Sequence, residues 1–193
     1  MKCKIYTAFF FLLVSLAAFC QDGENQSRKK GRWVVYVNAG PNYYFNNVVV
    51  GKDLVKEFNY AGTVKFMWEP EFRLSLGVET GYYRLYTAKG TGQGKVDIVN
   101  SATPLHFVAA MNFVRNYFFD LAIGPSFLKN KVHSETYGDF DGSSVSLADF
   151  SGTLSYRFNW NGRFRLGFGP RFFYSSHLND KSLALLFIAG YKL

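Results

Sequence analysis

The chain has 193 residues, which fits a single domain, and its mean hydropathy of −0.06 is close to zero. Aromatic residues make up 19% of the sequence, with 21 Phe and 13 Tyr, more than a soluble domain of this size usually holds. The formal net charge of +8 does not indicate nucleic-acid binding, because the basic residues are scattered and no DNA- or RNA-binding motif accompanies them.

The first twenty residues predict a secretory signal. Lys2 and Lys4 precede an apolar run, and a small-x-small pattern predicts cleavage between Cys20 and Gln21. The run is too short for a comfortable membrane-spanning helix, which needs about 20 apolar residues. The alternative is a lipidated Cys20, which the bulky residue before it disfavours. Cleavage after Cys20 leaves a chain without cysteine, which excludes disulfides and thiolate chemistry.

The segment from Arg163 to Ser175 shows the pattern that organises the rest of the chain. Read with a period of two, one face carries Phe164, Leu166, Phe168, Pro170, Phe172 and Tyr174, and the other carries mainly arginine and glycine. A soluble sandwich has the same period, but its outer face is rarely this aromatic. We therefore predict a signal peptide (1–20), a polar periplasmic leader (21–31) and a membrane β-barrel (32–193).

Eight segments repeat this alternation, and their connections alternate between long and short. The segments are 32–45, 58–68, 71–86, 95–113, 117–128, 147–160, 163–175 and 181–193. Tight turns fall at 69–70, 114–116 and Asn161-Gly162, and the longest connection is a polar loop at 129–146. The prediction is an all-β, eight-stranded antiparallel up-and-down transmembrane barrel in the outer membrane of a Gram-negative bacterium, with its long loops extracellular.

Aromatic residues collect at the predicted strand ends. The three tryptophans, Trp33, Trp68 and Trp160, fall at the periplasmic ends, and the opposite ends carry Tyr43, Tyr60, Tyr82 and Tyr174 among others. Amphipathic rings prefer the boundary between lipid and water. We expect two lipid-interface belts in contact with outer-membrane lipid. The scattered basic residues are expected to contact the phosphates of lipopolysaccharide.

Charged residues collect in the inward phase of the strands. The predicted lumen charge network consists of Arg73, Glu79, Asp120, Asp149, Arg157, Arg163, Arg165 and Arg171, with Glu71 and Lys192 in the same phase. An eight-stranded barrel is only wide enough for side chains to fill it. A lumen closed by ion pairs is therefore favoured, and a narrow path for ions is the alternative.

A Gly-Pro pair recurs at 40–41, 124–125 and 169–170, each a few residues below a predicted extracellular loop. A closed barrel has no free edge that would tolerate a residue without an N–H, so these pairs predict a bulge or kink at one height around the rim. Pro104 fits no such repeat.

The segment 183–193, LALLFIAGYKL, resembles the C-terminal signal by which outer-membrane barrels are recognised for insertion. Together with Gln21 and the Gly-Pro-x-Phe pattern at 124–127 and 169–172, the chain resembles the small outer-membrane barrels of Bacteroidetes, the PorT-like group, and the eight-stranded barrels of OmpX and OmpA type. The resemblance implies insertion by the barrel-assembly machinery through the strand at 181–193. It implies no reaction.

A lipid A-modifying hydrolase is a further alternative, because Ser175, Ser176 and His177 fall near the extracellular rim. The His-x-Ser-Asn arrangement in which known lipid A deacylases resemble one another is absent, and a triad is recognised by geometry rather than by proximity in sequence.

Metal chemistry has little support. Asp139-x-Asp141-Gly142 is similar to the start of a calcium loop, but no Glu follows at the required distance, so a plain turn is expected. His106 and His133 have no partners at ligand spacing. We predict no catalytic residue, cofactor or metal.

Two function hypotheses follow. The first is a structural or surface-interaction barrel that meets an extracellular protein or polysaccharide through its loops, chiefly 129–146. The alternative is a narrow channel for ions or small solutes.

Overall fold

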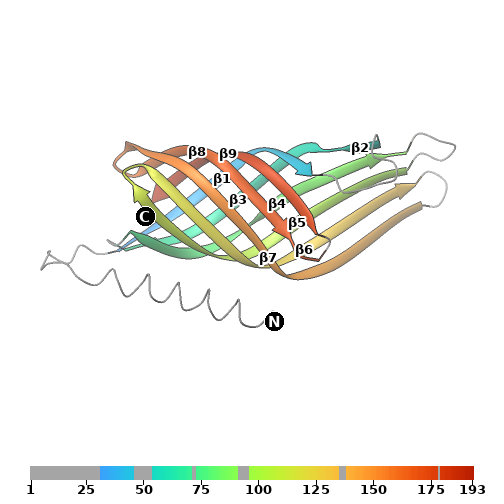
Figure 1. Cartoon of the computed structure of the whole chain (residues 1–193), viewed down its shortest axis with the longest axis horizontal. Helices are drawn as coiled ribbons and strands as arrows, with labels where there is room; N and C mark the ends of the chain where they lie inside the picture. Colours follow the sequence, from blue (N-terminus) through green and yellow to red (C-terminus); the bar gives the residue numbers. More distant parts are fainter. Residues whose placement is uncertain (1–30, 46–53, 71–72, 91–95, 135–137, 178) are drawn as a thin grey trace, which may run out of the picture. The chain divides into compact units, whose positions relative to one another are not determined.

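The alternating segments form strands that close into a barrel in the computed structural model (Figure 1). The structure describes residues 31–45, 54–70, 73–90, 96–134, 138–177 and 179–193. The predicted signal peptide, its cleavage site at Cys20 and Gln21, and residues 21–30 of the leader lie outside these ranges. No helix among the described residues is long and apolar enough to cross a membrane.

Eight long strands and one short strand make up the sheet in the described part of the chain. They are β1 (Arg32–Phe45), β2 (Val55–Lys56), β3 (Phe58–Glu69), β4 (Leu74–Lys89), β5 (Val96–Val114), β6 (Tyr117–Ser134), β7 (Gly138–Asn161), β8 (Phe164–Ser175) and β9 (Asp180–Lys192). Each long strand pairs antiparallel with its neighbours, and pairings of β4 with β5 and of β1 with β9 complete a ring of eight. The short β2 pairs with β4. The predicted fold class is confirmed.

The prediction of a loop at 129–146 is wrong. Strand β6 continues to Ser134 and β7 begins at Gly138, with register pairs from Lys129 opposite Ser143 up to Ser134 opposite Gly138. The polar, glycine- and serine-containing composition of the segment is typical of a loop. Strands outside the membrane are held by backbone hydrogen bonds, however, and need no apolar face. Figure 1 shows the ends of β4, β5, β6 and β7 continuing past the other strands.

The outside of the barrel is apolar and the inside is polar. Outward side chains such as Ile123, Phe168 and Phe187 are exposed by 61%, 53% and 67%. The inward residues between them include buried Asn, Ser, Thr and charged side chains. This is the reverse of a soluble domain, and it matches a barrel whose outer face contacts hydrocarbon.

The three glycines of the Gly-Pro pairs each face a backbone carbonyl oxygen of a neighbouring strand. A side-chain carbon would lie 1.9 Å from the Leu185 oxygen at Gly40, 2.4 Å from the Leu105 oxygen at Gly124 and 2.1 Å from the Leu154 oxygen at Gly169. No side chain fits at these distances. Close approach of the strands, rather than a turn, explains why glycine stands at these positions.

The predicted common bulge occurs at only one of the three pairs. The register between β6 and β7 shifts between Gly124 and Ser126. At Pro41 and Pro170 the register is the same before and after the proline, so the prediction of a bulge is wrong there. Pro104, which fits no sequence repeat, lies opposite Ser126 and therefore at the height of the Gly124 pair.

Replacing Gly169 with alanine tests the close approach of β7 and β8. We expect Gly169→Ala to lower the free energy of unfolding by about 2–3 kcal/mol, because the new methyl group overlaps the Leu154 carbonyl. Urea unfolding in lipid vesicles, followed by tryptophan fluorescence, measures the change. Gly152→Ala is the control, since its added carbon meets only Leu121 Cδ2 at 4.0 Å. Equal losses in both variants would contradict the explanation.

Candidate functional site

Five ionisable side chains from five strands meet inside the barrel. Lys65 Nζ lies 2.7 Å from Asp120 Oδ2 and 3.4 Å from Glu79 Oε2. Arg171 Nη1 donates to Glu79 Oε2 at 2.7 Å, and its Nη2 donates to Glu79 Oε1 as well. Arg157 Nη2 donates to Asp120 Oδ2. We call Lys65, Glu79, Asp120, Arg157 and Arg171 the lumen charge cluster.

The lumen charge cluster is buried and further hydrogen-bonded. All five side chains are at most 4% exposed. Arg171 Nη2 also donates to Ser151 Oγ at 2.6 Å, and Arg157 Nε donates to Ser155 Oγ at 2.9 Å. The Arg157 guanidinium lies 4.7 Å from the Phe118 ring centroid. Buried charges are tolerated when they are paired and hydrogen-bonded in this way. The bidentate hydrogen bonds from Arg171 fix the orientation of the Glu79 carboxylate.

A second charged group lies toward the short-turn end of the barrel. Arg165 Nη1 donates to Glu69 Oε1 at 2.8 Å, and the Tyr36 hydroxyl donates to the same carboxylate at 2.5 Å. A hollow of about 360 Å³ is lined there by Glu69, Pro70, Arg73, Ser75, Asn112, Phe113, Val114, Arg115, Phe118 and Arg165. It is an open mouth, and the lumen charge cluster is buried among other side chains deeper in the barrel.

Six of the eight predicted network residues lie in three settings within the barrel. Glu79, Asp120, Arg157 and Arg171 form ion pairs in the lumen charge cluster, Arg165 pairs with Glu69, and Asp149 lies near the opposite rim.

The assignment of Arg163 to the lumen network is wrong. Arg163 is exposed, forms no ion pair among the described residues and lies in the turn between β7 and β8, where strand alternation no longer fixes direction. Arg73 precedes the first residue of β4 and lines the hollow at the lumen mouth with Glu69 and Arg165, without an ion pair among the described residues. Lys192 is also partly exposed, and its Nζ donates to Asn159 Oδ1 at 2.9 Å. Glu71 lies outside the described residues.

Sequence reasoning missed Lys65, Tyr36 and Glu69. Lys65 stands between the outward Val64 and Phe66, so the same period of two would have assigned it to the interior. Its two acidic partners come from β4 and β6, and the sequence holds no signal for that pairing.

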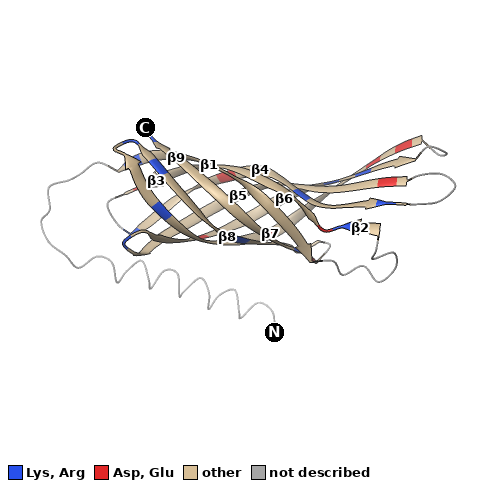
Figure 2. Cartoon of the chain, turned by 90° about the horizontal axis from the view of Figure 1, so that it is seen from above, with Lys and Arg blue, Asp and Glu red and all other residues tan. Residues whose placement is uncertain are grey.

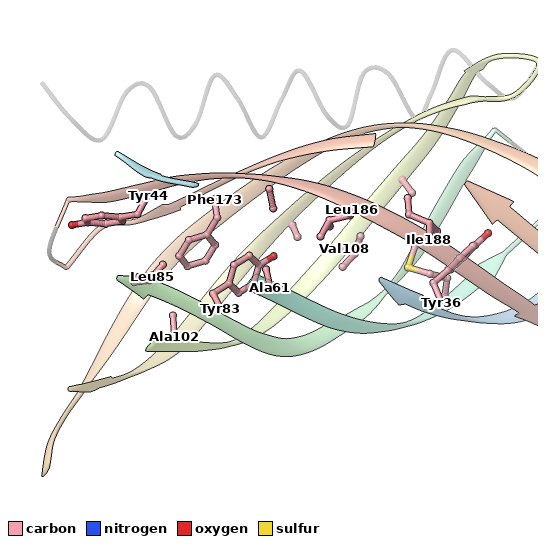
Figure 3. Packing of buried hydrophobic residues seen from close by; sticks show 14 of the residues in the cluster. Tyr36, Tyr44, Ala61, Tyr83, Leu85, Ala102, Val108, Phe173, Leu186 and Ile188 are labelled. Carbon is pink, nitrogen blue, oxygen red and sulfur yellow. The ribbon is translucent and has the colours of Figure 1, made fainter. Parts of the chain in front are cut away.

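Aromatic rings separate the lumen charge cluster from the opposite rim. The rings of Tyr83 and Phe173 are stacked with centroids 4.7 Å apart, and His106 lies 6.2 Å from Phe173. Figure 3 shows Tyr83 and Phe173 side by side between Tyr44 at one end of the buried row and Tyr36 at the other. His106 Nε2 is 3.2 Å from Ser126 Oγ, so this histidine has a polar partner inside the barrel.

The predicted belt residues lie on the outside. Trp33, Trp68 and Trp160 are exposed by 46%, 41% and 71%, and Tyr43, Tyr60 and Tyr82 are also exposed. Tyr174 is half-buried against Phe150, with ring centroids 4.9 Å apart. The positions are those that an interfacial role requires, and that role stays a prediction.

Four strands continue beyond the barrel rim as an open sheet, which we call the extension. It comprises β4 at 84–89, β5 at 96–101, β6 at 129–134 and β7 at 138–146. Strand β8 first pairs with β7 at Phe150, so the β7 edge over 138–146 has no neighbouring strand among the described residues. In Figure 2 the ribbon there carries blue and red positions of charged residues near the strand ends.

The extension has a charged face and an apolar row. Lys129 Nζ lies 3.3 Å from Asp141 Oδ2, and His133 Nδ1 contacts Asp139 Oδ1. On the inward face, Ile98 lies opposite Val132 and Val132 lies opposite Phe140, which is 61% exposed. Side chains directly opposite on adjacent strands share a face, so these three form one row across β5, β6 and β7. The expected turn at 139–142 is therefore wrong, since both aspartates belong to β7.

The serines and the histidine near the rim lie in different settings. Ser176 Oγ lies 3.2 Å from Ser146 Oγ, and Ser175 is fully buried. His177 is exposed, and no hydrogen bond joins it to these serines. Among the described residues, no three or more His, Cys, Asp or Glu side chains are grouped as metal ligands.

Comparisons with known proteins give the fold. No protein-family model matches the chain, and no curated protein is similar to it in sequence. The structure of Ail, the attachment invasion locus protein of Yersinia pestis, in complex with the heparin analogue sucrose octasulfate matches 86% of this chain and 100% of Ail, with 14% identity and a TM-score of 0.57. A second Ail structure matches with the same coverage, 12% identity and a TM-score of 0.54.

These similarities show the fold alone. A closed eight-stranded barrel with an apolar outside is the architecture of outer-membrane proteins of Gram-negative bacteria, and the chain is a protein of that kind.

Replacing Asp120 tests whether the lumen charge cluster depends on its central carboxylate. Asp120→Asn leaves Arg157 without its ion-pair partner and Lys65 with only the longer contact to Glu79. We expect the free energy of unfolding to fall by about 3–5 kcal/mol, measured by urea titration in vesicles. Asp141→Asn is the control, because its exposed ion pair contributes at most about 1 kcal/mol. A loss no larger than that of the control would contradict the assignment.

Proposed function

We propose that the protein is a surface-interaction barrel that binds an extended polypeptide of an extracellular protein by strand addition to the free edge of β7 in the extension. The observation that carries the proposal is the β7 edge over 138–146, which extends beyond the last β8 pairing at Phe150 and has no partner strand in the described part of the chain. An unpaired edge offers a row of backbone donors and acceptors that an extended peptide can complete.

Side chains on the extension favour a polypeptide over other partners. A strand added beside β7 would place alternate side chains next to the row formed by Ile98, Val132 and Phe140. Phe140 is already 61% exposed, so an apolar residue of the partner would bury it. Backbone pairing supplies affinity in this mode, and contacts of alternate side chains supply specificity.

A sulfated polysaccharide is the second candidate, because the similar Ail structure holds a heparin analogue. On the extension the basic side chains are offset by acidic ones, since Lys129 pairs with Asp141 and His133 contacts Asp139. Because the acidic side chains neutralise the basic ones, the extension attracts a polyanion only weakly, and a polypeptide is favoured as the partner.

Further parts of the proposal concern the membrane and assembly. We propose that the aromatic belts contact outer-membrane lipid and lipopolysaccharide, and that the barrel-assembly machinery recognises the chain through 181–193, which forms most of β9. The PorT-like pattern supports an origin in Bacteroidetes. Enzyme activity is not part of the proposal.

Binding of displayed peptides tests strand addition. A library of short random peptides on phage is selected against the barrel in lipid vesicles, and we expect the bound peptides to alternate apolar and polar residues. Phe140→Ser should weaken binding of these peptides by about tenfold or more, because it removes an apolar contact worth about 1.5–3 kcal/mol.

Two further variants complete this test. Val145→Ser is the matched control, because Val145 is 48% exposed on the opposite face of the same strand. Replacing residues 130–142 with an Asn-Gly turn, which joins Lys129 to the Ser143 opposite it, should abolish binding while the barrel still folds and shifts on gels when heated. Saturable binding of heparin instead of peptide would support the polysaccharide. Equal peptide binding by all variants would refute strand addition.

Bilayer recording tests the closed lumen. We expect the purified barrel to give no steady conductance in planar bilayers, because Lys65, Glu79, Asp120, Arg157 and Arg171 fill the cross-section with paired, buried side chains. Reproducible single-channel openings by the wild-type chain would favour the narrow channel.

A further inference from the structure

The buried charges of the barrel are unevenly distributed. The lumen charge cluster holds three cations, Lys65, Arg157 and Arg171, and two carboxylates, Glu79 and Asp120. Beyond the aromatic rings of Tyr83 and Phe173, two more carboxylates are buried, Asp149 at 0% and Asp180 at 5% exposure. No Lys or Arg among the described residues forms an ion pair with either of them.

These two carboxylates belong to a small group of inward positions, which we call the rim cluster: Asp149, Ser175, Asp180 and Ser182. Ser175 lies opposite Asp180 in the β8–β9 register, and the pairing of Phe150 with Tyr174 places Asp149 beside Ser175. Ser182 follows Asp180 on the same face of β9. Three adjacent strands thus present four oxygen-bearing side chains to the same part of the lumen.

Each carboxylate has one oxygen held by the protein and one oxygen free. Asp149 Oδ1 accepts from the Ser176 amide at 2.9 Å and from the Ser146 hydroxyl. Asp180 Oδ1 accepts from the Tyr44 hydroxyl at 2.5 Å. The other oxygens, Asp149 Oδ2 and Asp180 Oδ2, are buried and have no hydrogen-bond partner within the described ranges. Hydrogen bonds to one oxygen orient a carboxylate whose other oxygen binds a ligand.

The two serines are independent evidence that a ligand binds here. Ser175 and Ser182 are 0% exposed, and both hydroxyl oxygens lack a hydrogen-bond partner among the residues that the structure describes. Buried hydroxyls are normally hydrogen-bonded, because leaving them unpaired is costly. Two free carboxylate oxygens beside two free hydroxyls form a set of hard oxygen donors, and no described Lys or Arg forms an ion pair with the two carboxyl groups.

We propose that the rim cluster binds a divalent cation of the calcium type. Calcium takes oxygen ligands from carboxylates, neutral oxygens and water, and its charge would balance the two carboxylates. The site differs from a metal centre built on three or more acidic or histidine side chains, because hydroxyls supply half of the protein ligands. Binding links β7, β8 and β9 at the end of the barrel that carries the free edge of β7.

Terbium luminescence tests the proposal. The wild-type barrel, folded in detergent without lipopolysaccharide and freed of metal with a chelator, is titrated with Tb³⁺ under tyrosine excitation. The Tyr44 hydroxyl donates a hydrogen bond to Asp180, so the excited Tyr44 ring should transfer energy to a Tb³⁺ ion bound there. We expect saturable luminescence with one ion per chain, displaced by Ca²⁺.

Matched variants locate the ion. Asp149→Asn and Asp180→Asn should each weaken Tb³⁺ binding at least about tenfold, whereas Asp141→Asn, on the exposed extension, should leave it unchanged. Heat-shifted migration on gels verifies that each variant folds. Absence of saturable luminescence in the wild type, or unchanged affinity in both rim variants, would overturn the site.

Unfolding gives a second readout that needs no luminescence. Ca²⁺ should raise the urea midpoint of the wild type, because it binds the folded state only, and should have no effect on the rim variants. If the rim variants do not fold, Ser175→Ala and Ser182→Ala replace them, and the double serine variant should bind Tb³⁺ more weakly. An equal response to Ca²⁺ in wild type and variants would refute the proposal.

Discussion

Pairing of every backbone N–H and C=O within the protein is the constraint on which this structure depends. Hydrocarbon offers no hydrogen bonds, so a sheet that crosses the membrane has to close on itself. The ring closes through β4 with β5 and through β1 with β9. Closure with eight strands leaves a narrow interior, and the close approach of β7 and β8 at Gly169 leaves no room for a side chain between them.

The narrow interior explains the character of the lumen. Charges placed there have to be paired, and the lumen charge cluster joins β3, β4, β6, β7 and β8 through shared carboxylates. These contacts run across the barrel rather than along a strand, so they hold its cross-section in one shape. Past the rings of Tyr83 and Phe173 the balance of positive and negative side chains changes. The rim cluster there holds two carboxylates without a cationic partner among the described residues. The two ends of one lumen therefore differ in chemistry.

The constraint ends where the strands leave the hydrocarbon. The extension is an open sheet, and its β7 edge is unpaired over 138–146 among the described residues. Water can satisfy such an edge, which is why the strands do not need to close there. Edges of this kind also pair with other chains. The part of the molecule released from the requirement for closure is therefore the part available for recognition.

Alternation determined the eight long strands and their two faces, and the aromatic outer face determined the membrane setting. Successive side chains point to opposite sides of a strand by covalent geometry, so the direction of Glu79, Asp120, Arg157 and Arg171 follows from their neighbours. Alternation carries no information in turns, which is why the assignment of Arg163 was wrong. Composition also misled at 129–146, because serine, glycine and aspartate are compatible with a strand that is held by its backbone.

Tertiary structure decided the partners. Glu79 and Arg171 are 92 positions apart in the chain, and only closure of the ring brings them together across the lumen. The same is true of Lys65 and Asp120, and of Asp149 beside Ser175. The sequence determined which way each side chain points, because that depends on the adjacent residues. Which charge meets which depends on register and curvature, and these are properties of the whole barrel.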